Sequence, residues 1–280
     1  MSAHAFAIID VFTETPLTGN QLGVFPNASA IHETHCQHLA KELGFAETVF
    51  VLPADSGGTA RIRIFTPTTE LPFAGHPVLG TAIFIGAREG IDSVALETGA
   101  GLIPVELEGS NGRCATGRMT QPVPAWSAFP EESALLAALG VRESALPVEQ
   151  YSLGPTPVFV MLGSPGDVAA LQPDLMLLAR FPNAVSCIAR DGDHWKARVF
   201  VPGHGIPEDP ATGSAAGPMA LHLARHGAID FGEQIEIHQG EELGRPSVLF
   251  STAFGTAQAI ERVEVKGSAV VVAEGAFRFP

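Results

Sequence analysis

A short motif occurs twice in this chain, and each copy leads into an apolar stretch of small residues. The first copy spans residues 73–77 (FAGHP), and the second spans residues 210–214 (PATGS). Upstream, residues 63–67 (RIFTP) are matched by 198–202 (RVFVP), and the two extra residues of the second copy are assigned to the loop that follows. The period is far too long for a solenoid, so the echo predicts a single duplication of one structural unit.

The apolar stretches at residues 77–85 and 214–226 predict two helices without a polar face, which belong inside the protein. The rest of the chain alternates short apolar runs with turns, since it contains 30 Gly and 22 Pro. We therefore expect an α+β fold of two pseudo-symmetric halves, each with a curled, mostly antiparallel sheet around a central buried helix.

The expected division places residues 1–121 in an N-terminal half and residues 122–265 in a C-terminal half. The last strand, 266–280, is expected to join the N-terminal half. The proline-rich segment 122–130 is the expected connector between the halves.

Charge and composition exclude several classes of protein. The formal net charge is −14, which argues against nucleic-acid and anionic-membrane partners, because both need clustered Lys and Arg. No apolar run approaches the roughly 20 residues that span a bilayer, and the start lacks a signal-peptide pattern, so we expect a cytoplasmic protein. The three widely spaced cysteines form no disulfide framework and no zinc-finger pattern.

The duplicated motifs lie at predicted helix N-termini, where unpaired backbone N–H groups and the helix dipole favour an anion. Gly75 and Gly213 would let the backbone approach a ligand closely, although either could be a plain turn glycine. Because the motif is paired, we expect a site built between the two halves that binds a carboxylate or a developing enolate.

Four side chains near these motifs could take part in acid–base chemistry. His76 titrates near neutrality but could be a capping or core histidine. Glu47 enters a strand within an apolar run and could be a general base or a solvated strand-end acid, and its counterpart near Ala184 is not acidic. Asp209 and Ser214 could be helix caps, and Ser214 could also donate a hydrogen bond to a carboxylate. Glu208 is expected to be solvated.

Other types of site fit the sequence less well. Residues 75–81 have the glycine spacing of a phosphate loop but no Lys after the second Gly, and no dinucleotide-binding glycine motif follows a strand. Ser214, His76 and Asp209 could be drawn as a hydrolase triad, but residues 212–216 are not a nucleophile elbow. A metal site at His32, His35, His38 and Cys36 is disfavoured, because His35 and His38 fall on the polar side of a core-facing helix.

Longer stretches carry a family resemblance over essentially the whole chain. Residues 61–77 and 208–217 resemble the phenazine-biosynthesis isomerase family, and so do shorter stretches at 121–126, 194–195, 222–226 and 239–247. The resemblance implies the fold of diaminopimelate epimerase and proline racemase. Those racemases place one catalytic cysteine at the start of each buried helix. Ala74 and Ala211 stand at these places here, so two-thiol racemisation is excluded.

The resemblance instead implies Glu47 as the base that moves a proton, with His76 and Asp209 beside the substrate. Gly75, Thr212, Gly213 and Ser214 would bind the substrate, a small carboxylated cyclic compound. The implied reaction converts trans-2,3-dihydro-3-hydroxyanthranilate to an aminoketone by a proton shift from C3 to C1, without a cofactor or a metal. The resemblance also implies a homodimer.

Three alternatives remain open at this point. The chain could be a related isomerase or epimerase that acts on another small amino or hydroxy acid. It could be a binding protein that keeps the fold without catalysis, although such a protein need not retain Glu47 and His76. It could also be a hydrolase that uses Ser214 as its nucleophile.

Overall fold

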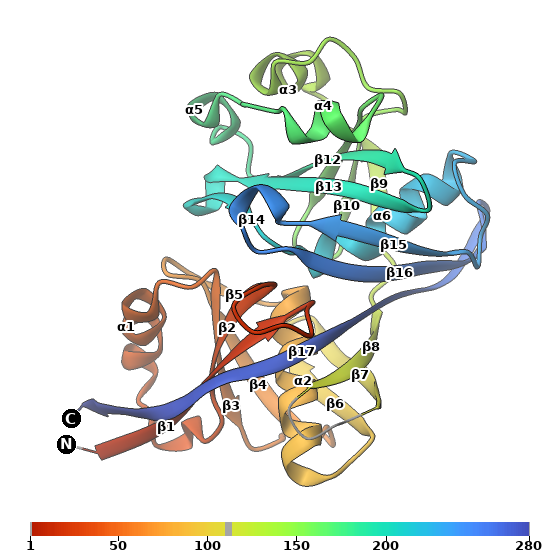
Figure 1. Ribbon diagram of the computed structural model, residues 1–280. Helices are drawn as coiled ribbons and strands as arrows, with labels where there is room; N and C mark the ends of the chain where they lie inside the picture. The colour runs from red at the N-terminus through yellow and green to blue at the C-terminus, as the bar shows by residue number, and fades with distance from the viewer. Residues whose placement is uncertain (1, 110–113, 280) are drawn as a thin grey trace. The chain divides into compact units, whose positions relative to one another are not determined.

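The computed structural model describes residues 2–109 and 114–279 and divides the chain into two compact units (Figure 1). The N-terminal unit comprises Met1–Thr120 with Lys266–Pro280, and the C-terminal unit comprises Gln121–Val265. The division expected from the sequence, 1–121 with 266–280 and 122–265, differs from these limits by one residue.

The N-terminal unit is built from strands wrapped around one helix. Its elements are β1 Ser2–Val11, β2 Asn20–Phe25, η1 Ala28–Ala30, α1 Glu33–Leu43, β3 Glu47–Leu52, β4 Ala60–Phe65, β5 Glu70–Leu71, α2 Gly75–Glu89, β6 Ser93–Thr98, β7 Gly101–Glu108, β8 Cys114–Gln121 and the second part of β17 Ala259–Phe279.

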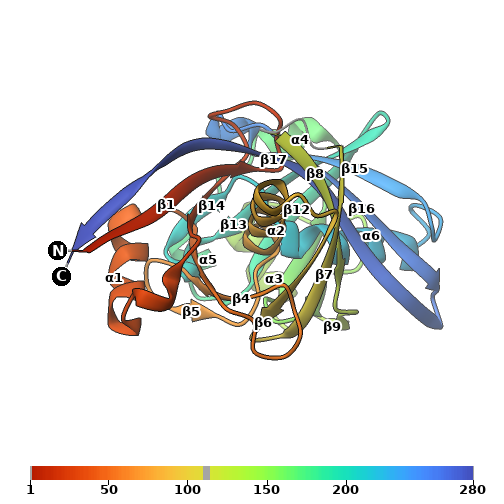
Figure 2. The same cartoon turned by 90° about the horizontal axis from the view of Figure 1, so that it is seen from below.

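The strands of the N-terminal unit close into a ring around α2. Hydrogen-bonded pairing runs β1–β2–β3–β4–β6–β7–β8–β17 and returns to β1. Every residue of α2 from Gly75 to Gly86 is buried, and Figure 2 looks nearly along this helix with the strands of the unit around it. The expected buried helix is confirmed. On the outer face, α1 covers an aromatic cluster that includes Phe25, Phe50 and Phe65.

The C-terminal unit has the same plan with additional outer helices. Its elements are β9 Ala125–Ala128, α3 Glu132–Leu139, β10 Glu149–Ser152, β11 Pro157–Met161, α4 Pro165–Ala169, α5 Leu175–Leu178, β12 Ala184–Asp191, β13 His194–Val201, η2 Pro202–His204, β14 Ile206–Asp209, α6 Gly213–Arg225, β15 Gln234–Gln239, η3 Glu241–Leu243, β16 Ser247–Thr256 and the first part of β17.

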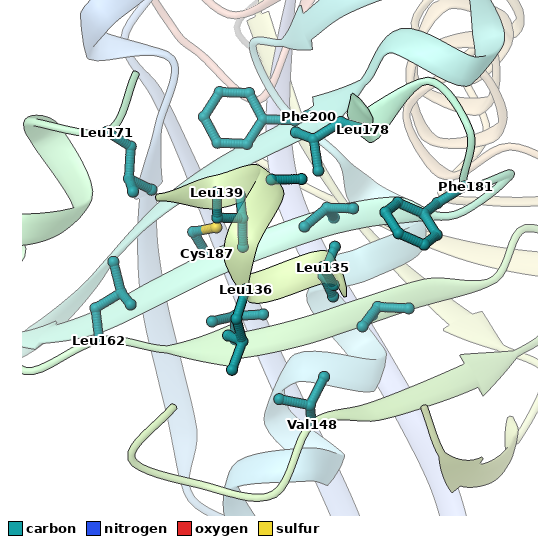
Figure 3. Packing of buried hydrophobic residues seen from close by; sticks show 14 of the residues in the cluster. Leu135, Leu136, Leu139, Val148, Leu162, Leu171, Leu178, Phe181, Cys187 and Phe200 are labelled. Atoms are coloured by element: carbon teal, nitrogen blue, oxygen red, sulfur yellow. The ribbon is translucent and has the colours of Figure 1, made fainter. Parts of the chain in front are cut away.

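The two faces of this sheet bury different helices. On β12, Ser186 and Ile188 line the inner side with α6 residues such as Ala215 and Met219. Cys187, which alternates with them, points to the outer side and joins an apolar cluster beneath α3, α4 and α5 (Figure 3). Residues Gly213 to Ala224 of α6 are all buried, so the second predicted buried helix is confirmed as well.

The order of strand pairing confirms the duplication. In the N-terminal unit β2–β3 is parallel, β3–β4 antiparallel, β4–β6 parallel and β6–β7 antiparallel. In the C-terminal unit β11–β12, β12–β13, β13–β15 and β15–β16 repeat this sequence of orientations. Both units therefore have one topology, which is the expected α+β arrangement of two pseudo-symmetric halves.

The register corrects one detail of the sequence echo. Phe65 pairs with Glu70, and Phe200, its counterpart, pairs with Glu208. The loop of the second copy is therefore longer by three residues rather than two. As a result α2 begins after its N-cap Ala74, whereas α6 begins after Thr212, one residue beyond Ala211. His76 and Ser214, each following the first glycine of its helix, occupy equivalent places.

The other differences concern short or continuous strands. The short strands β5, β10 and β14 lacked a recognisable alternation in the sequence. The expected connector 122–130 contains β9, which pairs with β10. The last strand was expected at 266–280, but β17 begins at Ala259 and runs unbroken to Phe279, so it belongs to both units.

A duplicated glycine–proline contact holds the segment before each buried helix. A methyl group on Gly99 would lie 2.8 Å from Cα of Pro72, and one on Gly240 would lie 2.5 Å from the backbone oxygen of Pro210. The second contact is tighter, since the same methyl group would lie 2.4 Å from the Arg245 oxygen and Gly240 has φ +81°.

Replacing Gly240 with Ala should therefore destabilise the protein by more than left-handed strain alone, which costs about 1–2 kcal/mol. The clash involves backbone atoms on both sides, so we expect a loss of about 3 kcal/mol or more. The matched control is Gly244→Ala, because Gly244 has φ +67° but open space around it. Urea unfolding measures both, and equal losses would contradict the close contact.

Candidate active site

The N-terminal unit brings three polar side chains together at the start of α2. Asn20 and Glu47 are the first residues of the neighbouring parallel strands β2 and β3, so both lie at the same edge of the sheet. His76 is the second residue of α2. Its Nε2 lies 3.5 Å from Oε2 of Glu47, and its Nδ1 lies 3.3 Å from Nδ2 of Asn20.

His76 is neutral in this setting. Burial lowers the pKa of its imidazole to about 3, and a hydrogen bond with the Gln21 backbone opposes this only weakly. The 3.5 Å approach to Glu47 is therefore not an ion pair at neutral pH, although the distance alone would allow one. The buried Nε2 has no hydrogen-bond partner among the described residues. A buried polar atom of this kind is costly, at about 1–3 kcal/mol, so Nε2 of His76 is a candidate contact for a bound ligand.

Glu47 is half-buried, with 15% of its side chain exposed. In the register it pairs with Leu22, just as Ala184 of the second copy pairs with Pro157. Ala184 is thus the counterpart of Glu47, as the sequence predicted. The expectation that only one copy carries this carboxylate is confirmed.

The C-terminal unit holds Asp209 at the end of β14, three residues before Thr212, the N-cap of α6. Asp209 is buried and accepts a hydrogen bond of 2.6 Å from the Thr212 hydroxyl at Oδ2. It does not cap the helix, because Thr212 occupies the N-cap position. Ser214 is also buried, and the carbonyl of Gly213 accepts a hydrogen bond of 2.8 Å from Gln121.

Glu208 is not solvated, contrary to the prediction. Its carboxylate accepts two hydrogen bonds from Arg198, of 2.8 Å and 2.7 Å, and only 9% of its side chain is exposed. The same bidentate pair occurs in the first copy between Arg63 and Glu70. The signal was present in the sequence, because Arg63 and Arg198 lie within the echo and each is followed by an acid that closes the hairpin.

Both buried helices start without a capping side chain, since neither Ala74 nor Thr212 makes a side-chain cap hydrogen bond. Their first N–H groups are therefore not satisfied by the residue that usually does so. This arrangement fits the predicted role of Gly75 and Gly213 at an anion-binding helix end.

The cysteines lie in environments unsuited to thiolate chemistry. Burial raises the pKa of all three thiols, that of Cys187 to about 12. Cys36 and Cys187 belong to apolar clusters beneath outer helices. A thiol must ionise to act as a base or nucleophile, so these positions give no support to cysteine catalysis.

One group of side chains in the C-terminal unit has the spacing of a metal site. Glu149, His222 and His226 place one ligand atom each within 4.8 Å of one another. However, Arg225 donates to Oε2 of Glu149 at 2.6 Å, the same oxygen that approaches both histidines. Burial alone would raise the pKa of Glu149, but hydrogen bonds from His222, Arg225, His226 and Tyr151 lower it. The guanidinium occupies the place of a cation, and we assign no metal to this group.

Two residues beside the predicted site were missed. Asn20 contacts His76, and Gln239 contacts the Asp209–Thr212 segment. Both lie in strands distant in sequence from the motifs, so neither spacing nor periodicity could place them there.

Comparison with known proteins now places the chain in a family. Residues 9–275 match the model of the phenazine biosynthesis-like proteins. The chain belongs to this family. It is 49% identical to the trans-2,3-dihydro-3-hydroxyanthranilate isomerase of Pseudomonas chlororaphis and 47% identical to that of Pseudomonas aeruginosa, each over 97% of this chain and 98% of the relative.

Solved structures of other proteins have the same fold as this chain. A Bacillus anthracis phenazine biosynthesis protein of the PhzF family superposes with a TM-score of 0.87 at 25% identity, over the whole of both chains. A hydroxyproline epimerase from Agrobacterium vitis shares the fold alone, with a TM-score of 0.67 at 16% identity over 99% of this chain and 91% of the epimerase. The diaminopimelate epimerase-like fold implied by the sequence is confirmed.

Across residues 2–109 and 114–279, no helix has both the length and the apolar composition that crossing a bilayer requires.

The buried neutral state of His76 should appear in the pH dependence of stability. An unfolded histidine binds a proton below about pH 6.5, whereas folded His76 does so only near pH 3. The contribution of neutral His76 to the free energy of unfolding is therefore fully present above pH 6.5 and is lost as the pH falls toward 3. By pH 5 the loss from this residue should be about 2 kcal/mol.

Urea unfolding of the wild type and of His76→Asn at pH 7.5 and pH 5 measures this loss. The variant should lose about 2 kcal/mol less than the wild type between the two pH values. The exposed His38 provides the control, and His38→Asn should follow the wild-type curve. Parallel curves for the wild type and His76→Asn would show that His76 is not held neutral.

Proposed function

We propose that this protein is an isomerase that converts trans-2,3-dihydro-3-hydroxyanthranilate to an aminoketone, a step of phenazine biosynthesis. The observation that carries the proposal is the identity of 47–49% over 97% of the chain to relatives named for this activity. The paired Glu47 and His76, with the unsatisfied Nε2 of His76, supply a fitting acid–base group.

Glu47 is the proposed base. Its carboxylate takes the proton from C3 of the substrate, the ring double bonds shift, and the same group returns the proton at C1. The enol formed in this way tautomerises to the ketone, so the reaction is balanced without a cofactor or a metal. Half-burial limits the solvation of the carboxylate, which favours proton transfer to and from carbon.

The remaining predicted residues orient the substrate in this proposal. Neutral His76 presents a polar nitrogen beside Glu47, and Asp209 accepts hydrogen bonds, so together they suit the hydroxyl and amino groups. Gly75, Gly213 and Ser214 lie at the starts of α2 and α6, and they suit the carboxylate through backbone N–H groups and the serine hydroxyl. Thr212 was predicted to join them, but its N–H donates to Gln239 and its hydroxyl to Asp209, so it supports the site from behind.

The second candidate is a related isomerase or epimerase of another small amino or hydroxy acid. It is favoured by a predicted epimerase from Pseudomonas aeruginosa, which superposes with a TM-score of 0.84 at 30% identity. Against a two-thiol mechanism stand Ala74 and its equivalent Thr212, neither of which is a cysteine, and the buried positions of Cys36 and Cys187. A hydrolase using Ser214 has no support beyond the residue itself.

The expected homodimer and the cytoplasmic location remain predictions. Light scattering coupled to size-exclusion chromatography tests the first, and a mass of one 29.3 kDa chain would contradict it.

The activity is tested by incubating the protein with trans-2,3-dihydro-3-hydroxyanthranilate in deuterated water. The diene absorbance should disappear, and any deuterium incorporated in the isomerisation step should appear at C1. An unchanged substrate would remove the specific assignment and favour the second candidate.

Replacing Glu47 with Gln keeps the shape of the side chain but removes the base. The rate should fall by about 10²–10⁴-fold, the usual contribution of general base catalysis. The matched control is Glu42→Gln, an exposed glutamate on α1. Circular dichroism should show that both variants fold, and a folded Glu47→Gln protein with full activity would exclude Glu47 from the mechanism.

A further inference from the structure

The side chain of Gln239, at the end of β15, reaches the segment that carries Asp209. Its Nε2 donates to the backbone carbonyl of Asp209 at 2.7 Å and to the hydroxyl of Thr212 at 3.0 Å, and its Oε1 accepts from the Thr212 N–H at 3.2 Å. Gln239 is buried, with 3% exposure. One amide therefore holds both ends of a four-residue segment.

The chemistry of these partners fixes the direction of every hydrogen bond. A backbone carbonyl only accepts and a backbone N–H only donates, so the amide of Gln239 cannot be turned around. Because Nε2 also donates to Thr212 Oγ1, the Thr212 hydroxyl directs its own hydrogen to Oδ2 of Asp209, 2.6 Å away. The result is a directed relay from Gln239 through Thr212 to the Asp209 carboxylate.

The first copy of the duplicated unit lacks this relay at the same place. The pairs Arg61–Glu97 and Lys196–His238 are equivalent in the register, so Thr98 is the counterpart of Gln239 and Gly99 that of Gly240. Thr98 instead donates to Gly101 and accepts from Ala100 within its own turn. The residue equivalent to Asp209 in the first copy is Leu71, the last residue of β5.

Both copies thus share the same backbone arrangement, and the Gln239 amide occurs in the copy that carries Asp209. The glycine–proline contact exists in both copies, so Gln239 is not needed to close the turn itself. The glycine–proline contact therefore serves the shared backbone, and Gln239 serves the segment with Asp209.

We propose that Gln239 is a positioning residue for the isomerase reaction and that it acts through the Thr212 hydroxyl to hold and orient the Asp209 carboxylate toward the substrate. The inference rests on the proposed function for its catalytic meaning. The hydrogen-bond relay can be tested without it.

Steady-state kinetics with trans-2,3-dihydro-3-hydroxyanthranilate test the proposal in Gln239→Glu, which keeps the shape and loses both donors. We expect kcat/KM to fall by about tenfold or more, in the range for misplaced catalytic groups. The pH profile of kcat/KM should also move, because a second carboxylate beside Asp209 disfavours the ionised forms of both. Thr98→Val is the matched control, and its kinetics and pH profile should equal those of the wild type.

Thr212 variants test the route and do not depend on the folding of a Gln239 variant. Thr212→Val should lose activity, and Thr212→Ser, which restores the hydroxyl, should recover most of it. The double variant Thr212→Val with Gln239→Glu should lose no more than about twofold beyond the more damaging single change, because both break one relay. Additive losses, or full activity in Thr212→Val, would overturn the relay.

Hydrogen exchange of the Thr212 amide tests the hydrogen bond to Gln239 separately from its role in catalysis. It should be slow in the wild type and in Thr98→Val, and at least about tenfold faster in Gln239→Leu, which has no acceptor. If the wild type leaves the substrate unchanged while this acceleration is seen, the proposed function fails and the relay stands. If the wild type is active and Gln239→Glu stays within about twofold of it, the positioning role is wrong.

Discussion

The burial of two helices that have no polar face determines the rest of this structure. An apolar helix must be covered on all sides, and in the N-terminal unit a closed ring of strands covers α2. In the C-terminal unit β11, β15 and β16 pack against α6. Inside such a wrapping, ligands can reach the helix only at its ends. The N-terminal ends of α2 and α6 are therefore the places where polar chemistry can occur, and Glu47, His76, Asp209 and Ser214 lie at or beside them.

The duplicated frame carries chemistry that is not duplicated. The bidentate arginine–glutamate pair and the glycine–proline contact occur in both copies, so they belong to the scaffold. Across equivalent positions, Glu47 is matched by Ala184, Asp209 by Leu71 and Gln239 by Thr98. A reaction that used the two copies alike would need like groups in both. The chain instead fits a mechanism with one base.

The sequence predicted the fold well, because its strongest signals were long-range and repeated. The apolar runs at 77–85 and 214–226 and the echo between the halves were enough to predict both buried helices and the pseudo-symmetry. The alignment of the second motif with the first was wrong by one residue, because the similarity at the two ends of the loop does not fix the length of the loop. Short strands such as β5 and β14 were missed because two to four residues hold too little periodicity.

Of the site, the residues within motifs were found, and those that contact them from other strands were not. Glu208 was misjudged because a charged residue in a turn is usually solvated, and the arginine and acid that recur together in both copies were not recognised as a pair. Asn20 and Gln239 gave no local signal, since their roles depend on which strands become neighbours.

The central claim is that one carboxylate on one copy removes and returns the proton. A single-turnover reaction with substrate deuterated at C3, run in ordinary water and quenched before product exchange, tests it most directly. A single base predicts that part of the deuterium appears at C1 of the product. Two bases on opposite copies predict a C1 hydrogen drawn wholly from solvent at the earliest times, and that result would contradict the account.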